Sequence, residues 1–202
     1  MIDQARFERI KKSHGSYASW AVWSDAGERP KSNIGDLSIF DIEKRDTLLS
    51  QLEPNIVLVA LSAASRSIQF SLGNFHDRRA RYAQDYKLRY ALHGTSLWGA
   101  YMTDIIKGVE QNESGKVMQY LKNNKSIEKA NIESFRAELR DLGVAQPTIV
   151  ALGGDAFTVL TRNLGGQDHV WKMPHYSQHI SKEDYREQCL TVIELIDGQP
   201  SV

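Results

Sequence analysis

Residues 56–61, Ile-Val-Leu-Val-Ala-Leu, form an unbroken apolar run, and the small polar segment 62–67 follows it directly. A run that is rich in β-branched residues and shows no polar alternation is typical of a parallel strand buried on both faces. Ligands of open α/β sheets bind beyond the carboxyl ends of such strands. We therefore expect a parallel α/β sheet whose functional site has segment 62–67 as its floor.

The rest of the chain alternates between strand and helix patterns. Helical spacing of apolar residues or capping signals predict helices over 79–92, around 132–142, over 155–163 and from Ser181 onward. Three further strands are predicted at 100–106, 147–152 and 169–173. This alternation indicates a three-layer α/β/α fold around a mainly parallel four-stranded sheet.

We expect residues 1–202 to form one domain, with 1–54 as an N-terminal helical arm. Helices are predicted at 4–14 and 41–52, and an irregular segment between them is expected to be anchored by Trp20 and Trp23. The polar stretch 108–124 is predicted to be an exposed excursion.

Charge and cysteine content exclude several classes of protein. The chain has 25 Lys and Arg against 25 Asp and Glu, so any binding of nucleic acid must use a local surface. The single Cys189 excludes an internal disulfide framework and a cysteine-based zinc site.

Residues 1–4 lack a secretory pattern, and no apolar run is long enough to span a bilayer. We expect a cytoplasmic protein that needs no metal or cofactor, while its oligomeric state stays open.

Common catalytic signatures are absent from the sequence. It contains no G-x-G-x-x-G, G-x-x-x-x-G-K-[ST], G-x-S-x-G or H-E-x-x-H motif. What remains are polar or small residues directly after or late in the predicted strands, which a parallel sheet brings to one edge. These are Ser62, Ser65, Asp104, Gly153, Gly154 and the segment 175–177.

Taken in order, these segments resemble the uracil-DNA glycosylase-like superfamily. The resemblance is carried by Leu-Val-Ala-Leu-Ser-Ala-Ala at 58–64, Phe75, Tyr-Met-Thr-Asp-Ile-Ile-Lys at 101–107, Ala-Leu-Gly-Gly-Asp-Ala at 151–156 and Met-Pro-His-Tyr-Ser at 173–177. It implies a fold of that family, binding of damaged DNA, and cleavage of the N-glycosidic bond of an extruded base during base-excision repair.

The resemblance also implies roles for individual residues. Asp104 stands where the family has a base-reading Asn, Phe75 where it has a stacking aromatic, and His175 where a histidine supports the charge on the departing base. Ser62 stands where the family has a water-activating residue, commonly within Gly-x-Asn-Pro-Gly, and neither the glycine nor the proline is present here. We expect Ala63 to line the base site, and Ser65, Arg66, Gly153, Gly154 and Ser177 to contact phosphate.

Ser62 and Asp104 differ in type from the residues of the family, and this changes how water activation and base reading could work. A serine is a poor general base at neutral pH, so hydrolysis needs a water held by Ser62 or by a carboxylate such as Asp104. An ionised carboxylate only accepts hydrogen bonds, so Asp104 favours a base with N–H donors unless burial protonates it. Two other interpretations stay open: a non-catalytic member that binds nucleic acid, a nucleotide or a protein, and a pocket for an unrelated small-molecule reaction.

Five of the singled-out residues also have a purely structural interpretation. Phe75 fits a core position, and the two glycines fit close packing of a strand against a helix. Asp104 fits a strand-end cap, and His175 fits a structurally bonded loop histidine.

Overall fold

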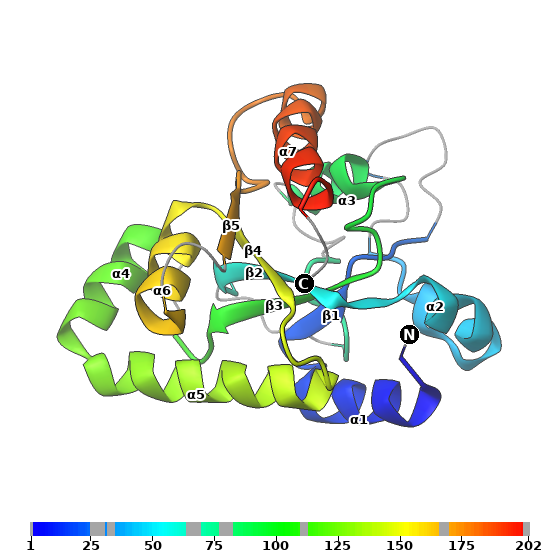
Figure 1. The fold of residues 1–202 in the computed structure, drawn as a ribbon, viewed down its shortest axis with the longest axis horizontal. Helices are drawn as coiled ribbons and strands as arrows, with labels where there is room; N and C mark the ends of the chain where they lie inside the picture. The colour runs from blue at the N-terminus through cyan, green and yellow to red at the C-terminus, as the bar shows by residue number, and fades with distance from the viewer. Residues whose placement is uncertain are drawn as a thin grey trace.

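Five strands form one mostly parallel sheet in the order β1-β3-β2-β4-β5 (Figure 1). The computed structural model describes residues 2–24, 31, 35–63, 70–76, 83–109, 113–165 and 170–199. Only β1 runs antiparallel to its neighbour, and the other pairs are parallel. The strands are β1 (Ala18–Trp20), β2 (Glu53–Ser62), β3 (Ala100–Ile106), β4 (Thr148–Leu152) and β5 (Val170–Met173).

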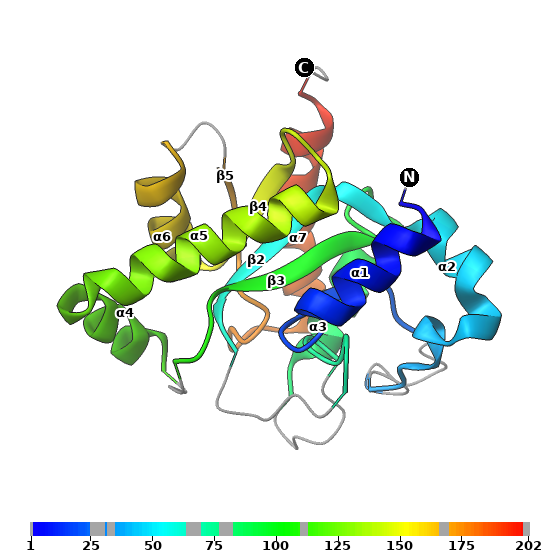
Figure 2. The ribbon, with the colours of Figure 1, turned by 90° about the horizontal axis from the view of Figure 1, so that it is seen from below.

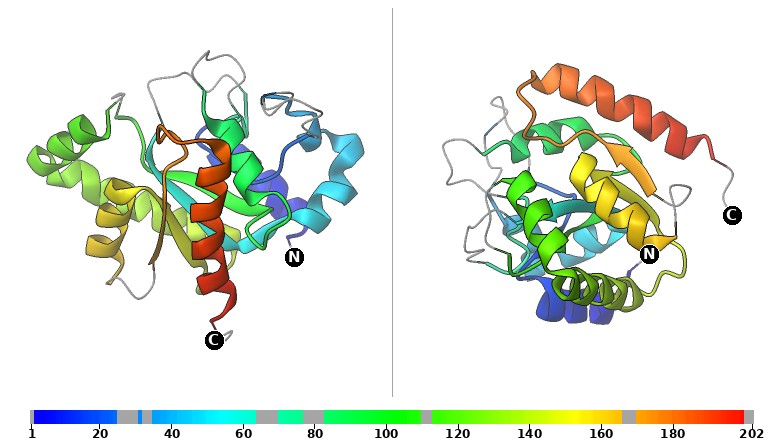
Figure 3. Two further views of the ribbon diagram at one scale, coloured as in Figure 1. Left: turned by 90° about the horizontal axis from the view of Figure 1, so that it is seen from above. Right: turned by 90° about the vertical axis from the view of Figure 1, so that its left-hand side faces the viewer.

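Helices cover both faces of the sheet, as the views in Figures 2 and 3 show. α3 (Asp85–Leu92) and α7 (Lys182–Asp197) pack together on one face. The opposite face is covered by α1 (Gln4–His14), α4 (Ser114–Asn123), α5 (Lys125–Leu142) and α6 (Gly154–Leu164), with α2 (Arg45–Gln51) and the short 3₁₀ turns η1 (Ser38–Phe40) and η2 (Ile42–Lys44) beside them. None of the helices in the described ranges is long and apolar enough to cross a membrane.

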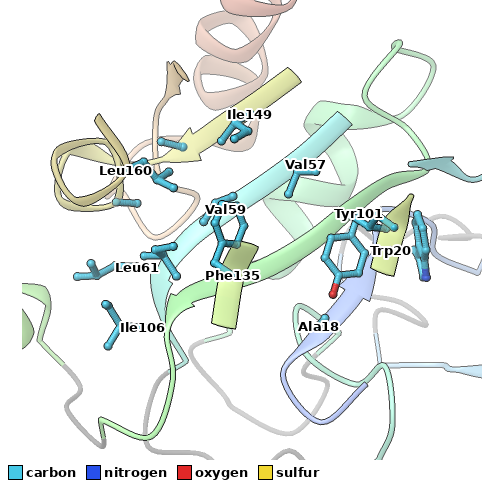
Figure 4. Packing of buried hydrophobic residues seen from close by; sticks show 14 of the residues in the cluster. Ala18, Trp20, Val57, Val59, Leu61, Tyr101, Ile106, Phe135, Ile149 and Leu160 are labelled. Atoms are coloured by element: carbon cyan, nitrogen blue, oxygen red, sulfur yellow. The ribbon is translucent and has the colours of Figure 1, made fainter. Parts of the chain in front are cut away.

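Side chains of the central strand β2 alternate between two apolar layers. Val57, Val59 and Leu61 belong to the cluster under α1, α5 and α6, part of which Figure 4 shows. Leu58 and Ala60 belong to the cluster under α3 and α7. Because both faces are buried, the strand reads as a continuous apolar run in the sequence.

Most of the predicted elements are confirmed within a few residues. The segment 100–106 is a strand with the predicted limits, and α1 spans the predicted 4–14. Helix α5 ends at Gly143, which adopts a left-handed φ of 68°, and the Ser181 side chain caps α7 by accepting the Asp184 N–H. Trp20 and Trp23 are buried, as expected of anchors. Of the helix predicted over 79–92, residues 79–82 lie outside the described residues and α3 begins at Asp85.

Three predictions are wrong. The sheet has five strands rather than four, because Ala18–Trp20 pairs with β3 as an edge strand instead of forming part of an irregular arm. The stretch 108–124 is not a plain excursion, because it contains α4, which buries Val117 and Leu121 against the core. The helix predicted over 41–52 is shorter, since η2 precedes α2 and Leu52 is already extended.

Candidate functional site

One row of residues crosses the sheet near its carboxyl edge on the side of α3 and α7. In this row, Asp104 of β3 pairs with Ala60 of β2, and Leu152 of β4 pairs with Met173 of β5. Ala60 lies beside Leu152 because the residues that precede them, Val59 and Ala151, are paired. Adjacent strands lie about 4.8 Å apart, so roughly 14 Å separates the Cα atoms at the two ends of the row. Ser62 follows Ala60 by two residues and lies on the same face as Asp104.

Asp104 is a buried carboxyl with a specific hydrogen-bond partner. Its side chain is 2 % exposed, and the Asn74 Nδ2 donates to its Oδ2 over 2.7 Å. Burial raises the pKa of Asp104 to about 7, although the Asn74 hydrogen bond and the charge of Lys107 both lower it. The carboxyl therefore changes its charge near neutral pH, and can act either as a donor or as an acceptor.

The loop 70–76 carries Asn74 and Phe75 to this carboxyl and is fixed along its length. The Leu72 N–H donates to the Gly15 carbonyl over 2.7 Å, and the Leu72 carbonyl accepts from the Ser19 hydroxyl over 2.8 Å. Leu72 and Phe75 have left-handed φ values of 62° and 64°, which cost roughly 1–3 kcal/mol each for bulky residues. The hydrogen bonds to α1 and β1 hold the loop in this conformation.

Phe75 is held at both of its backbone polar groups. Its N–H donates to the Asn74 Oδ1 over 3.1 Å, and its carbonyl accepts from the Trp23 indole Nε1 over 3.3 Å. The ring is 4 % exposed and meets Tyr176 edge-on, with a centroid distance of 6.5 Å. In this structure Phe75 is a core residue, and its ring face becomes accessible only if a neighbouring side chain moves.

His175 lies beyond β5 with its ring in a defined tautomer. The Ser177 backbone N–H points at the His175 Nδ1 over 3.1 Å, so Nδ1 is an acceptor and the ring proton of the neutral form is on Nε2. The Ser177 hydroxyl lies 2.8 Å from the same Nδ1. Burial lowers the pKa of His175 to about 4, so the ring is neutral at pH 7 and offers Nε2–H as a donor.

A continuous series of contacts links Asp104 to His175. Asp104 is bonded to Asn74, Asn74 to the Phe75 N–H, and the Phe75 ring meets Tyr176. Tyr176 in turn stacks on His175 at a centroid distance of 4.4 Å. The three residues predicted to read, stack and support a base therefore belong to one assembly.

Gly153 lets His175 sit close to the β4–α6 turn. A Cβ on Gly153 would lie 3.2 Å from the His175 Cβ, and its φ of 95° also favours glycine. The Gly153 N–H donates to the Met173 carbonyl over 2.8 Å. These contacts support the structural interpretation of Gly153, while phosphate contact by Gly153 or by Gly154, the first residue of α6, stays a prediction.

The remaining predicted residues are only partly placed. Ser62 ends β2 and Ala63 follows it, both half-buried at the carboxyl edge. Ser65 and Arg66 lie outside the described residues. Ser177 is exposed, but its hydroxyl is engaged with His175. Within the described ranges, no group of three or more His, Cys, Asp or Glu side chains is arranged to hold a metal.

The sequence predicted no role for Asn74 or Tyr176, although Tyr176 lies within the segment 175–177 expected at this edge of the sheet. Asn74 directly precedes Phe75, but its partners are 30 residues away at Asp104 and 57 residues away at the Tyr17 carbonyl. Tyr176 links two aromatic contacts, one with Phe75 and one with His175. Their adjacency to Phe75 and His175 was the available signal.

Comparisons of the chain with protein-family models, curated proteins and solved structures find no significant match.

Proposed function

We propose that this chain is a divergent uracil-DNA glycosylase-like protein that takes an extruded nucleobase at the carboxyl edge of its sheet and hydrolyses the N-glycosidic bond. The observation that supports it best is the series of contacts from Asp104 through Asn74, Phe75 and Tyr176 to His175. It brings a hydrogen-bonding carboxyl, an aromatic ring and an imidazole donor to one face of the sheet.

Each group has a role that follows from its state. In the reaction, the C1′–N bond breaks, its electron pair leaves with the base, and water supplies oxygen to C1′. His175, neutral and protonated on Nε2, donates to an oxygen of the departing base and stabilises the negative charge that develops there. Phe75 supplies an aromatic face for stacking, after displacement of a neighbouring side chain.

Asp104 has two roles that depend on its charge. When ionised it accepts an N–H from the base, or it accepts a proton from the attacking water. When protonated it donates to a base carbonyl. Because its pKa is about 7, both forms are present at neutral pH. Ser62, on the same face, holds the water but has no charge with which to activate it.

A second candidate function is binding without base release. It is favoured by Ser62 at the position where the family has its water-activating residue, and by the Phe75 ring, which is only 4 % exposed. A protein of this kind would bind a base or nucleotide at the same edge and leave the glycosidic bond intact.

One experiment separates the two candidates. Single- and double-stranded oligonucleotides carrying uracil, hypoxanthine or xanthine are incubated with the wild type, Asp104→Ala and His175→Ala, and both retention of DNA and release of free base are measured. A glycosylase releases a base, and both variants reduce that release. Retention that depends on the modified base and on Asp104, without release, favours the binding protein. If the wild type neither retains the DNA nor releases a base, both candidate functions are contradicted.

A further inference from the structure

Asn74 makes three hydrogen bonds with one side-chain amide. Its Nδ2 donates to the Asp104 Oδ2 and to the Tyr17 carbonyl, each over 2.7 Å, and its Oδ1 accepts the Phe75 N–H over 3.1 Å. A flipped amide would place its oxygen against the Tyr17 carbonyl and its NH₂ against the Phe75 N–H. Because the Tyr17 carbonyl can only accept and the Phe75 N–H can only donate, these two groups fix the orientation of the amide.

The partners of Asn74 come from separate parts of the fold. Tyr17 directly precedes β1, whose Ala18 pairs with Thr103, so the Tyr17 carbonyl lies beside Asp104 at the edge of the sheet. Phe75 has a left-handed backbone that needs support, and the Asn74 oxygen satisfies its N–H. One side chain thus joins the edge strand, the buried carboxyl and the aromatic ring.

We propose that Asn74 is the positioning residue of this site, because its amide holds the Asp104 carboxyl and the Phe75 backbone in a single geometry and presents both to the same base. The inference rests on the proposed function. Asn74 acts through Asp104 and Phe75 and need not touch the base itself.

The bond from Asn74 also decides which oxygen of Asp104 takes a proton. Since Oδ2 accepts the amide N–H, protonation falls on Oδ1, and Oδ1 is then the oxygen that changes from acceptor to donor. The other charged groups acting on Asp104 are Lys107, which favours the ionised form, and Glu138, which opposes it. These two groups form an ion pair with each other.

The test follows the Asp104 side-chain carboxyl carbon by NMR as pH is varied in the full chain. Asn74→Ala removes a donor that favours the carboxylate, so the titration midpoint of Asp104 moves to higher pH. Asn74→Ser is the second variant, because a serine hydroxyl still accepts a nearby backbone N–H but is too short to reach Asp104. Ser19→Ala is the matched control, since it loosens the same loop at Leu72 without touching Asp104, and it leaves the midpoint unchanged.

The functional arm is a double-mutant cycle on base release or, if there is none, on retention of the modified oligonucleotide. Asn74→Ala reduces the measured quantity about ten- to a hundredfold in the wild type, and has little further effect in Asp104→Ala. An Asp104 midpoint that Asn74→Ala leaves in place, or a loss that simply adds to that of Asp104→Ala, overturns the inference. Absence of both release and retention in the wild type overturns the proposed function instead, while the NMR titration still decides whether Asn74 controls Asp104.

Discussion

His175 packs so closely on Gly153 that a Cβ on the glycine would lie 3.2 Å from the His175 Cβ. The contact joins the end of β4 to the segment after β5, and it sets the position of the imidazole above the sheet. We expect Gly153→Ala to destabilise the protein by about 1–3 kcal/mol, because it adds both a close contact and an unfavourable φ.

Gly165→Ala is the matched control for this variant. Gly165 has a φ of 97°, close to that of Gly153, but no atom of the described residues lies within 4 Å of its Cβ position. Denaturant unfolding of both variants separates backbone strain from the His175 contact, and only Gly153→Ala should shift the His175 ring signals in an NMR spectrum. Equal shifts in the two variants would contradict the packing argument.

Asp104 is expected to make folding less favourable as pH rises from about 4 to about 7. Its pKa is about 7 in the folded chain and 3.8 in the reference state, so the folded state binds the extra proton between these values. The free energy of unfolding contributed by this group therefore falls from about pH 4 to pH 7. Asp104→Asn should stabilise the protein by about 2–4 kcal/mol more at pH 8 than at pH 4, because the amide needs no proton.

Denaturant unfolding of the wild type and Asp104→Asn at the two pH values checks this prediction. The variant keeps an oxygen that accepts the Asn74 N–H, so packing changes little. A stabilisation that is the same at both pH values would show that Asp104 ionises in the ordinary range.

His175 has the opposite linkage to pH. Its pKa is about 4 in the folded chain against 6.5 in the reference state, so the unfolded state binds a proton first as pH falls. The stability from this group is fully present above pH 6.5 and is lost as pH falls toward 4, by about 1–2 kcal/mol after allowance for partial exposure of the ring. His175→Gln should flatten this part of the stability curve, as measured by chemical unfolding at pH 7 and pH 4.5.

Glu138, whose side chain is fully buried, forms an ion pair with the partly buried Lys107 on the other face of β3. The Glu138 carboxylate also accepts the hydroxyls of Thr103 over 2.8 Å and Tyr101 over 3.1 Å. Glu138→Ala leaves the Lys107 ammonium without its partner and should destabilise the protein by about 3–5 kcal/mol. Glu133→Ala is the control on the same helix, since Glu133 pairs with Arg136 at the surface and should cost less than about 1 kcal/mol in thermal unfolding.

The parts of the fold that the sequence predicts well are those with a strong local signal. The apolar run in β2 and the helical spacing of Ile132 and Phe135 in α5 each describe an element buried by its own residues. β1 was missed because three residues, Ala18–Trp20, carry too little pattern, and they become a strand only by pairing with β3. α4 was missed because Val117 and Leu121 are its only fully buried residues.

The candidate site also contains residues that the sequence indicates and features that depend on long-range contacts. The sequence singles out Asp104 and His175 because a parallel sheet gathers the ends of its strands, which topology alone predicts. It does not single out Asn74, because the importance of Asn74 depends on the long-range approach of the loop 70–76 to Tyr17 and Asp104. The pKa of Asp104 likewise depends on burial and on charges from other elements, and no local pattern reports these.

The most direct measurement is the single-turnover rate at which free base appears from a duplex carrying uracil, hypoxanthine or xanthine, for the wild type, His175→Ala and Glu133→Ala. We expect release from at least one of the three by the wild type, a rate about a hundredfold lower for His175→Ala, and an unchanged rate for Glu133→Ala. Release that is as fast in His175→Ala as in the wild type, or no release from any of the three by the folded wild type, would contradict the proposed glycosylase.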